Sequence, residues 1–138
     1  MRPSSRCVLA VALLVIGLGC ADGPVALPGN VPQVEAVSAS VTRGEVVALR
    51  LANPRVLDWS YDLCSDGRLQ RAEGSPWVDA PEALMSCATV LYSLRARSAT
   101  EGAVYVPRGI PTGVHRVRVR FTCGGNTVHV TSNTFAVE

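Results

Sequence analysis

The stretch that decides the fold is Val114-His-Arg-Val-Arg-Val-Arg-Phe-Thr-Cys-Gly-Gly-Asn-Thr-Val-His-Val-Thr131. Apolar residues and arginines alternate up to Phe121, and a period of two indicates a β-strand with one buried face. The pair Gly124-Gly125 is typical of a two-residue hairpin turn with positive φ. Such a turn places Phe121 opposite Val128, so the apolar residues of both strands share one face.

The same kind of pattern extends over the rest of residues 34–138, where short β-type runs are separated by turn formers. We expect strands at 34–41, 45–52, 56–64, 67–72, 76–79, 87–95, 101–106, 114–123 and 126–137. The apolar parity shifts after Val130, which predicts a bend near Asn133. A helical period occurs only at 81–86, which is too short to matter. The pattern therefore predicts an antiparallel all-β domain, with Trp59 and Tyr61 at or near its core.

Several segments of this domain carry a family resemblance. They are Trp59-Ser-Tyr-Asp-Leu-Cys64, Arg68-Leu-Gln-Arg71, Pro76-Trp-Val78, Cys87, the run Pro107–Val119 and the closing run Ser132–Val137. Together they resemble bacterial immunoglobulin-like domains over most of residues 35–138. The resemblance implies an immunoglobulin-like antiparallel β-sandwich of about seven to nine strands. Some members of this group are lipoproteins or surface modules, a related type resembles proteinase inhibitors, and no catalytic residues come with the family.

The N-terminal segment has the composition of an export signal. Arg2 and Arg6 precede the uncharged run Val8–Ile16, which is too short to span a bilayer. The ending Gly17-Leu-Gly-Cys20 resembles a bacterial lipobox, although Gly17 replaces the usual large aliphatic residue. We expect residues 1–19 to be the signal peptide and Cys20 to be the site of lipid attachment. Ordinary cleavage after Ala21, giving a secreted or periplasmic protein, is the alternative.

Residues 20–33 form a tether rich in proline and glycine, which is extended where proline sets the backbone. It joins the lipid-bearing cysteine to the domain at 34–138. Ala21 is not the aspartate that retains some lipoproteins at the inner membrane. The sequence therefore favours the outer membrane and predicts a membrane partner through the lipid on Cys20.

Charge argues against a nucleic-acid partner. All 13 basic side chains are arginine, and Arg2 and Arg6 leave with the signal, so eleven remain against 11 acidic residues. A nucleic-acid-binding domain shows a clustered basic surplus. The expected partner is instead an unknown envelope protein or a glycan.

Cysteine placement predicts one disulfide in an oxidising compartment. Cys64 lies on the polar parity of its strand, and Cys87 aligns with polar neighbours, so we favour a Cys64–Cys87 bond. Cys123 has inward parity beside the hairpin turn, and we expect it to be packed and free. The pairing of Cys87 with Cys123 stays open, as does a reactive Cys123 that joins two chains.

The side chains that carry chemistry are scattered. The hairpin register places His115 and His129 roughly 17 Å apart, which is too far for one metal ion. Asp58 and Asp62 share a strand face, but strand faces expose carboxylates routinely. No nucleophile elbow, phosphate loop or Cys-x-x-Cys pair occurs. We expect no enzyme activity, no metal and no cofactor.

The candidate binding surface is the ridge Arg116, Arg118 and Arg120, whose side chains point the same way. It has the chemistry to bind acidic glycans, phosphates or carboxylates, but a solvated face with cross-strand polar pairs is the favoured interpretation. The expected function is an envelope-anchored, non-enzymatic binding or structural module. The alternative is a small proteinase-inhibitor-like domain that acts through an exposed loop at Ser65–Gly67 or Ala99–Gly102.

Overall fold

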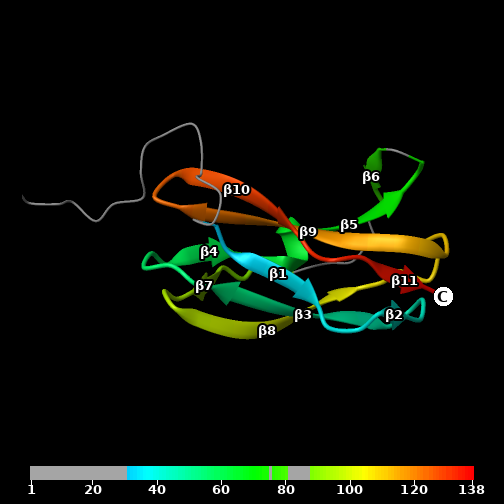
Figure 1. Cartoon of the computed structure of the whole chain (residues 1–138), viewed down its shortest axis with the longest axis horizontal. Helices are drawn as coiled ribbons and strands as arrows, with labels where there is room; N and C mark the ends of the chain where they lie inside the picture. The colour runs from blue at the N-terminus through cyan, green and yellow to red at the C-terminus, as the bar shows by residue number, and fades with distance from the viewer. Residues whose placement is uncertain (1–30, 75, 81–87) are drawn as a thin grey trace, which may run out of the picture.

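The computed structural model describes residues 31–74, 76–80 and 88–138. Within them the chain forms an all-β sandwich of two packed antiparallel sheets (Figure 1). The elements are β1 (Gln33–Ala36), β2 (Ser40–Val41), β3 (Val46–Asn53), β4 (Trp59–Tyr61), α1 (Leu63–Asp66), β5 (Gly67–Ala72), β6 (Trp77–Asp79), β7 (Tyr92–Leu94), β8 (Ser98–Tyr105), β9 (Gly113–Cys123), β10 (Asn126–Thr131) and β11 (Phe135–Val137).

One sheet has three strands in the order β1-β3-β8, so β3 is central and both β1 and β8 are edges. The other sheet is organised around β9, which pairs with β10 and β11 on one side and with β4 and β5 on the other. The short strand β2 pairs in parallel with β11 and thereby belongs to this second sheet. Figure 1 shows the β5–β6 hairpin projecting from the body of the sandwich.

The predicted hairpin register is confirmed. Phe121 lies opposite Val128, and Arg120 lies opposite His129. Gly124 and Gly125 have φ values of 55° and 83°, the left-handed region that the primed turn requires and that glycine reaches without strain. The turn residues and the apolar parity therefore specify the same register.

The core lies between the inward faces of β3 and β9. Val47, Leu49 and Leu51 are fully buried on β3, and Val117, Val119 and Phe121 are fully buried on β9. Burying each such side chain contributes about 1.5–3 kcal/mol relative to leaving it exposed. Trp59 and Tyr61 are also buried, which confirms their predicted place at or near the core.

The predicted strand ranges needed correction at three places. The single strand expected at 34–41 is two strands, β1 and β2, which belong to different sheets. The strand expected at 56–64 is shorter, because Asp62 caps the one-turn helix α1. In the described part of 87–95, only Tyr92–Leu94 forms a strand.

Two further boundaries concern the ends of strands. β8 begins at Ser98 rather than at residue 101, so it is longer than predicted. The run 126–137 is broken into β10 and β11 at residues 132–134, which confirms the bend predicted near Asn133. The helical period at 81–86 lies outside the described residues.

Candidate functional site

An open groove of about 910 Å³ lies between the two sheets on the side of β8. Residues Thr100–Tyr105 of β8 form one wall. The opposite wall comes from α1, β5 and the β4–β7 pair of the larger sheet. The groove brings together residues that are far apart in sequence.

Two tyrosines form the aromatic part of the groove. The rings of Tyr61 on β4 and Tyr92 on β7 stack with centroids 5.7 Å apart. Tyr61 is buried, and this burial, together with the neighbouring Tyr92, raises the pKa of its hydroxyl. Tyr92 keeps 52% of its surface exposed. The pair therefore presents one fixed ring and one accessible ring to the groove.

Asp62 is a buried carboxylate at the base of the same wall. Burial alone would raise its pKa. The Ser65 hydroxyl and the backbone N–H groups of Cys64, Ser65 and Val90 donate hydrogen bonds to it, and the pKa falls below its usual value. The carboxylate therefore fixes the N-terminus of α1 and ties this helix to the segment that leads into β7.

α1 packs closely against β8 at Gly102. A Cβ atom at Gly102 would lie 2.3 Å from Leu63 Cδ1, so a larger residue there would require the end of the Leu63 side chain to move. Leu63 comes from α1, so the helix lies directly over the middle of β8. This contact places the floor of the groove against the strand.

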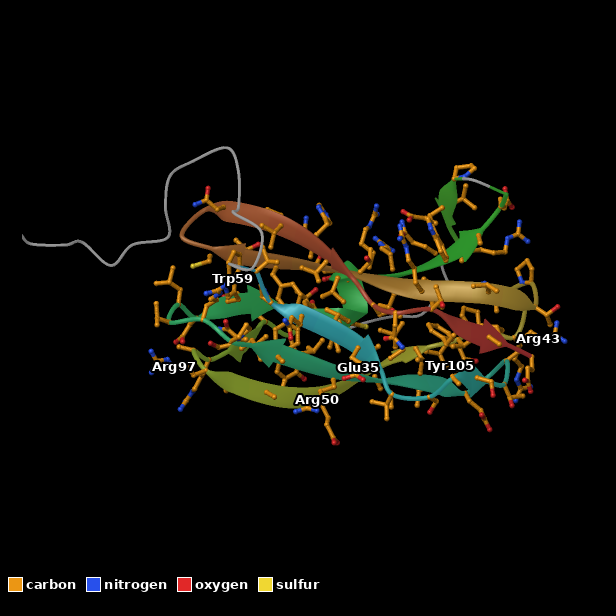
Figure 2. The ribbon with its side chains drawn as sticks, in the orientation of Figure 1. Glu35, Arg43, Arg50, Trp59, Arg97 and Tyr105 are labelled. Carbon is orange, nitrogen blue, oxygen red and sulfur yellow. The ribbon has the colours of Figure 1, made fainter. Side chains whose placement is uncertain are left out.

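The outer edge of β8 carries unpaired backbone groups. Val106 donates its N–H to Glu45 O at 2.8 Å, on the side of β3. Because backbone groups alternate between the two sides of an antiparallel strand, those of Ala99, Glu101, Ala103 and Tyr105 point away from β3. Within the described chain no strand pairs with that side of β8. Figure 2 labels Tyr105, the last residue of β8, and Arg50, the β3 residue that is paired with Glu101.

The arginines of the predicted ridge have partners on α1 and on the β5–β6 hairpin. Arg116 donates from Nε to Gln70 Oε1 at 2.9 Å, and its guanidinium lies 4.2 Å from the centre of the Trp77 ring. Arg118 pairs with Asp79 at 3.0 Å. Arg120 pairs with Asp66. Arg116 and Gln70 form a cross-strand polar pair of the kind that the favoured interpretation expects. The partners of Arg118 and Arg120 lie instead on β6 and α1.

The two histidines and the two aspartates do not form a common site. His115 is fully buried, with Nδ1 3.0 Å from Gly113 O and with no hydrogen-bond partner for Nε2 among the described residues. His129 is exposed on β10. Asp58 accepts the N–H of Ala96 at 2.7 Å, so it holds a loop. Among the described residues there is no cluster of three metal-ligating side chains.

Cys64 and Cys123 are both disulfide-bonded. Cys123 is buried, as predicted, but the prediction that it is free is wrong. Strand parity locates a side chain on one face, whereas a covalent partner depends on which segment the fold brings to it. Cys87 lies outside the described residues, so the pairing of Cys64 with Cys87 stays a prediction. Cys20 also lies outside them.

The two loops proposed for a proteinase inhibitor are not loops. Ser65 and Asp66 belong to α1, and Gly67 begins β5. Ala99–Gly102 lies inside β8 and pairs with β3 from Leu49 to Ala52. The capped helix α1 holds Ser65 and Asp66, and strand pairing holds Gly67 and Ala99–Gly102, so neither segment projects as an exposed loop.

The groove itself was not predicted from the sequence. The available sequence signal was the run Val90-Leu91-Tyr92, in which three large apolar or aromatic residues follow one another. In the structure all three side chains are exposed. The alternation of apolar and polar residues could not predict the groove, because this run contains no polar residue. An unusually exposed apolar run marks an interaction surface more often than a solvated strand.

Comparison with known proteins adds no family. No protein-family model matches the chain, and no curated protein matches it. No helix in the described chain is long and apolar enough to cross a membrane. The geometry of the sandwich and its groove is therefore the basis for assigning a function.

Proposed function

We propose that this chain is an exported, lipid-anchored, immunoglobulin-like domain that acts as a non-enzymatic binding or structural module of the cell envelope. The export-type segment and Cys20 support the anchor. The β-sandwich is consistent with a rigid scaffold whose surfaces bind a partner. Its ligand is an envelope protein or a glycan, and the outer membrane is the favoured location.

The observation that carries the binding role is the groove beside β8. Its walls combine the accessible ring of Tyr92 with the polar side chains of Thr100, Glu101 and Arg68. Concave sites that bind ligands join apolar or aromatic surface to a few polar groups in this way. The groove is a better candidate than the arginine ridge, because each ridge arginine already has an intramolecular partner.

The proteinase-inhibitor alternative loses its support. An inhibitor of that kind inserts an exposed loop into a protease cleft. Both segments proposed for this task are held in regular elements, at α1–β5 and within β8. No other described feature favours inhibition.

Affinity capture from gently solubilised envelope tests the proposal. The full-length protein, a groove variant (Tyr92→Ala) and a ridge variant (Arg116→Glu, Arg118→Glu and Arg120→Glu) serve as baits. We expect a near-stoichiometric protein or glycan that the wild type and the ridge variant retain and the groove variant loses. Equal retention by all three baits, or loss with the ridge variant alone, contradicts the groove as the binding surface.

Intact mass tests the anchor separately. The proposal predicts a mature chain that begins at Cys20 and carries the added mass of acyl chains. Cys20→Ser removes that mass and releases the protein from the membrane fraction. An unacylated mature wild-type chain contradicts the lipid anchor while leaving the groove proposal untouched.

A further inference from the structure

We infer that β8 is a self-association strand, through which two copies of this chain pair their β8 edges antiparallel and join their three-stranded sheets into one. The inference concerns the described strands only. It therefore holds whether or not the chain is lipid-anchored.

The first observation is that the β8 edge is long and unprotected. β8 has 8 residues, and its outer backbone groups have no strand partner within the described chain. Natural edge strands are usually protected by charges, prolines, bulges or a covering segment. β8 contains no proline, and its one charged residue is Glu101. Most of its side chains are small and leave the backbone accessible.

The second observation is that β8 is complementary to itself in one register. A two-fold axis at Gly102 places Ala99 opposite Tyr105 of the second copy and Thr100 opposite its Val104. The same axis places Glu101 opposite Ala103 of the second copy. In this register, each residue whose backbone N–H and C=O point away from β3 lies opposite another such residue, so the two can exchange hydrogen bonds. Small side chains also lie opposite larger ones.

Neighbouring registers are less favourable. An axis at Glu101 places this carboxylate opposite its own copy, and like charges directly opposite each other are destabilising. The register at Gly102 separates the two carboxylates and places a residue without a side chain at the crowded centre. Isologous contacts of this kind close into a dimer and do not propagate.

The third observation is exposed apolar surface on the same side of the molecule. Leu91 is 71% exposed, Tyr92 is 52% exposed and Val90 is 43% exposed. Val90 and Tyr92 line the groove together with β8, and β7 contacts β8. Pairing at β8 brings these residues of both copies toward one interface. A second copy is therefore the occupant that both the edge register and the apolar surface favour.

Sedimentation velocity of the full chain in density-matched mild detergent tests the inference. We expect a dimer at about 100 µM, which is a hundred times a Kd of about 1 µM. Ala103→Pro removes an outward N–H, and Ala103→Lys adds a charge to the edge. Each should raise the Kd at least about tenfold. Ala48→Lys is the matched control, because Ala48 is the register partner of Ala103 but lies on the central strand.

Cysteine cross-linking tests the register. In a mixture of differently tagged Glu101→Cys and Ala103→Cys chains, we expect rapid formation of a mixed disulfide. Each variant alone should cross-link slowly, since the proposed axis does not place either residue opposite its own copy.

A monomer at about 100 µM overturns the inference, as does a dimer whose Kd is the same for the wild type, Ala103→Pro and Ala103→Lys when it is measured by dilution. A monomer that binds an envelope peptide at β8 also overturns self-association. That result would leave the capture experiment above unaffected.

Discussion

The two edges of the three-stranded sheet differ in how their backbone groups are satisfied. At the β1 edge, Asn133 accepts the N–H of Ala36 at 2.7 Å and donates to its carbonyl at 3.1 Å. At the β8 edge, no described strand or side chain takes an equivalent place along Ala99–Tyr105. One amide side chain reproduces both hydrogen bonds of a neighbouring strand. An open edge is therefore a property of β8 and not of the sheet as a whole.

The covered edge depends on the break between β10 and β11. The chain bends at residues 132–134 as it leaves β10, which lies beside β1. Ser132 holds this bend, because its hydroxyl accepts the N–H of Val117 at 2.9 Å and donates to Asn133 O. The bend therefore delivers Asn133 to β1. On the other side, α1 packs over the inner face of β8 through Leu63 and leaves the edge itself uncovered.

The largest expected difference is in the free energy of unfolding when proline replaces either of two paired alanines, Ala48 on β3 or Ala103 on β8. Ala48 accepts a hydrogen bond at 3.0 Å from Val37, the residue that follows β1. The N–H of Ala48 points to the same side of β3 by alternation. Ala48→Pro should cost on the order of 3 kcal/mol. Ala103→Pro should stay within about 1 kcal/mol of the wild type. Urea unfolding at a concentration low enough to keep the chain monomeric measures both. Similar losses would show that β8 is not an open edge.

A smaller effect is expected at the covered edge. Asn133→Ala removes two hydrogen bonds to Ala36, each of which contributes about 0.5–1.5 kcal/mol, so the free energy of unfolding should fall by about 1–3 kcal/mol. Hydrogen exchange at the Ala36 amide should become faster while exchange in β8 stays unchanged. Glu35→Ala is the control, because this side chain is exposed on the same strand. An equal loss in the control would contradict a specific role for Asn133.

The smallest effect concerns pH. An amide holds the β1 edge, whereas the wall beside β8 depends on the carboxylate of Asp62, whose pKa is lowered by its hydrogen bonds despite burial. This stabilisation is fully present above the ordinary aspartate pKa of about 3.9 and disappears as the pH falls through the lower folded-state pKa. Exchange in α1 should therefore accelerate below about pH 4, and exchange in β1 should not.

Asp62→Asn provides the test, because asparagine keeps a capping oxygen but does not titrate in this range. The variant should lose less stability than the wild type between pH 4 and pH 2. Glu35→Gln serves as the exposed acidic control and should follow the wild-type profile. If Asp62→Asn also follows the wild-type profile, Asp62 does not couple α1 to pH.

Much of the fold was predictable wherever a local pattern had a single solution. The Gly124-Gly125 turn and the alternation up to Phe121 fixed the last hairpin residue by residue. The parity shift after Val130 located the bend at Asn133. The ridge arginines were placed on one face, with polar pairing as the favoured interpretation. The hairpin register and the face of the arginines depend on residues close in sequence, so spacing carries the information. The partners of these arginines (Gln70, Asp79 and Asp66) are distant in sequence and were not predicted.

The sequence by itself therefore determined the β class, the faces of β3 and β9, and the hairpin register, because side-chain period and turn chemistry are local properties. Only the tertiary structure decided that Asn133 covers β1 and that α1 packs on Gly102. It also decided that Cys123 is bonded and that β8 has an open edge beside a groove. Each of these depends on segments distant in the chain coming together, and their contacts leave no period in the sequence.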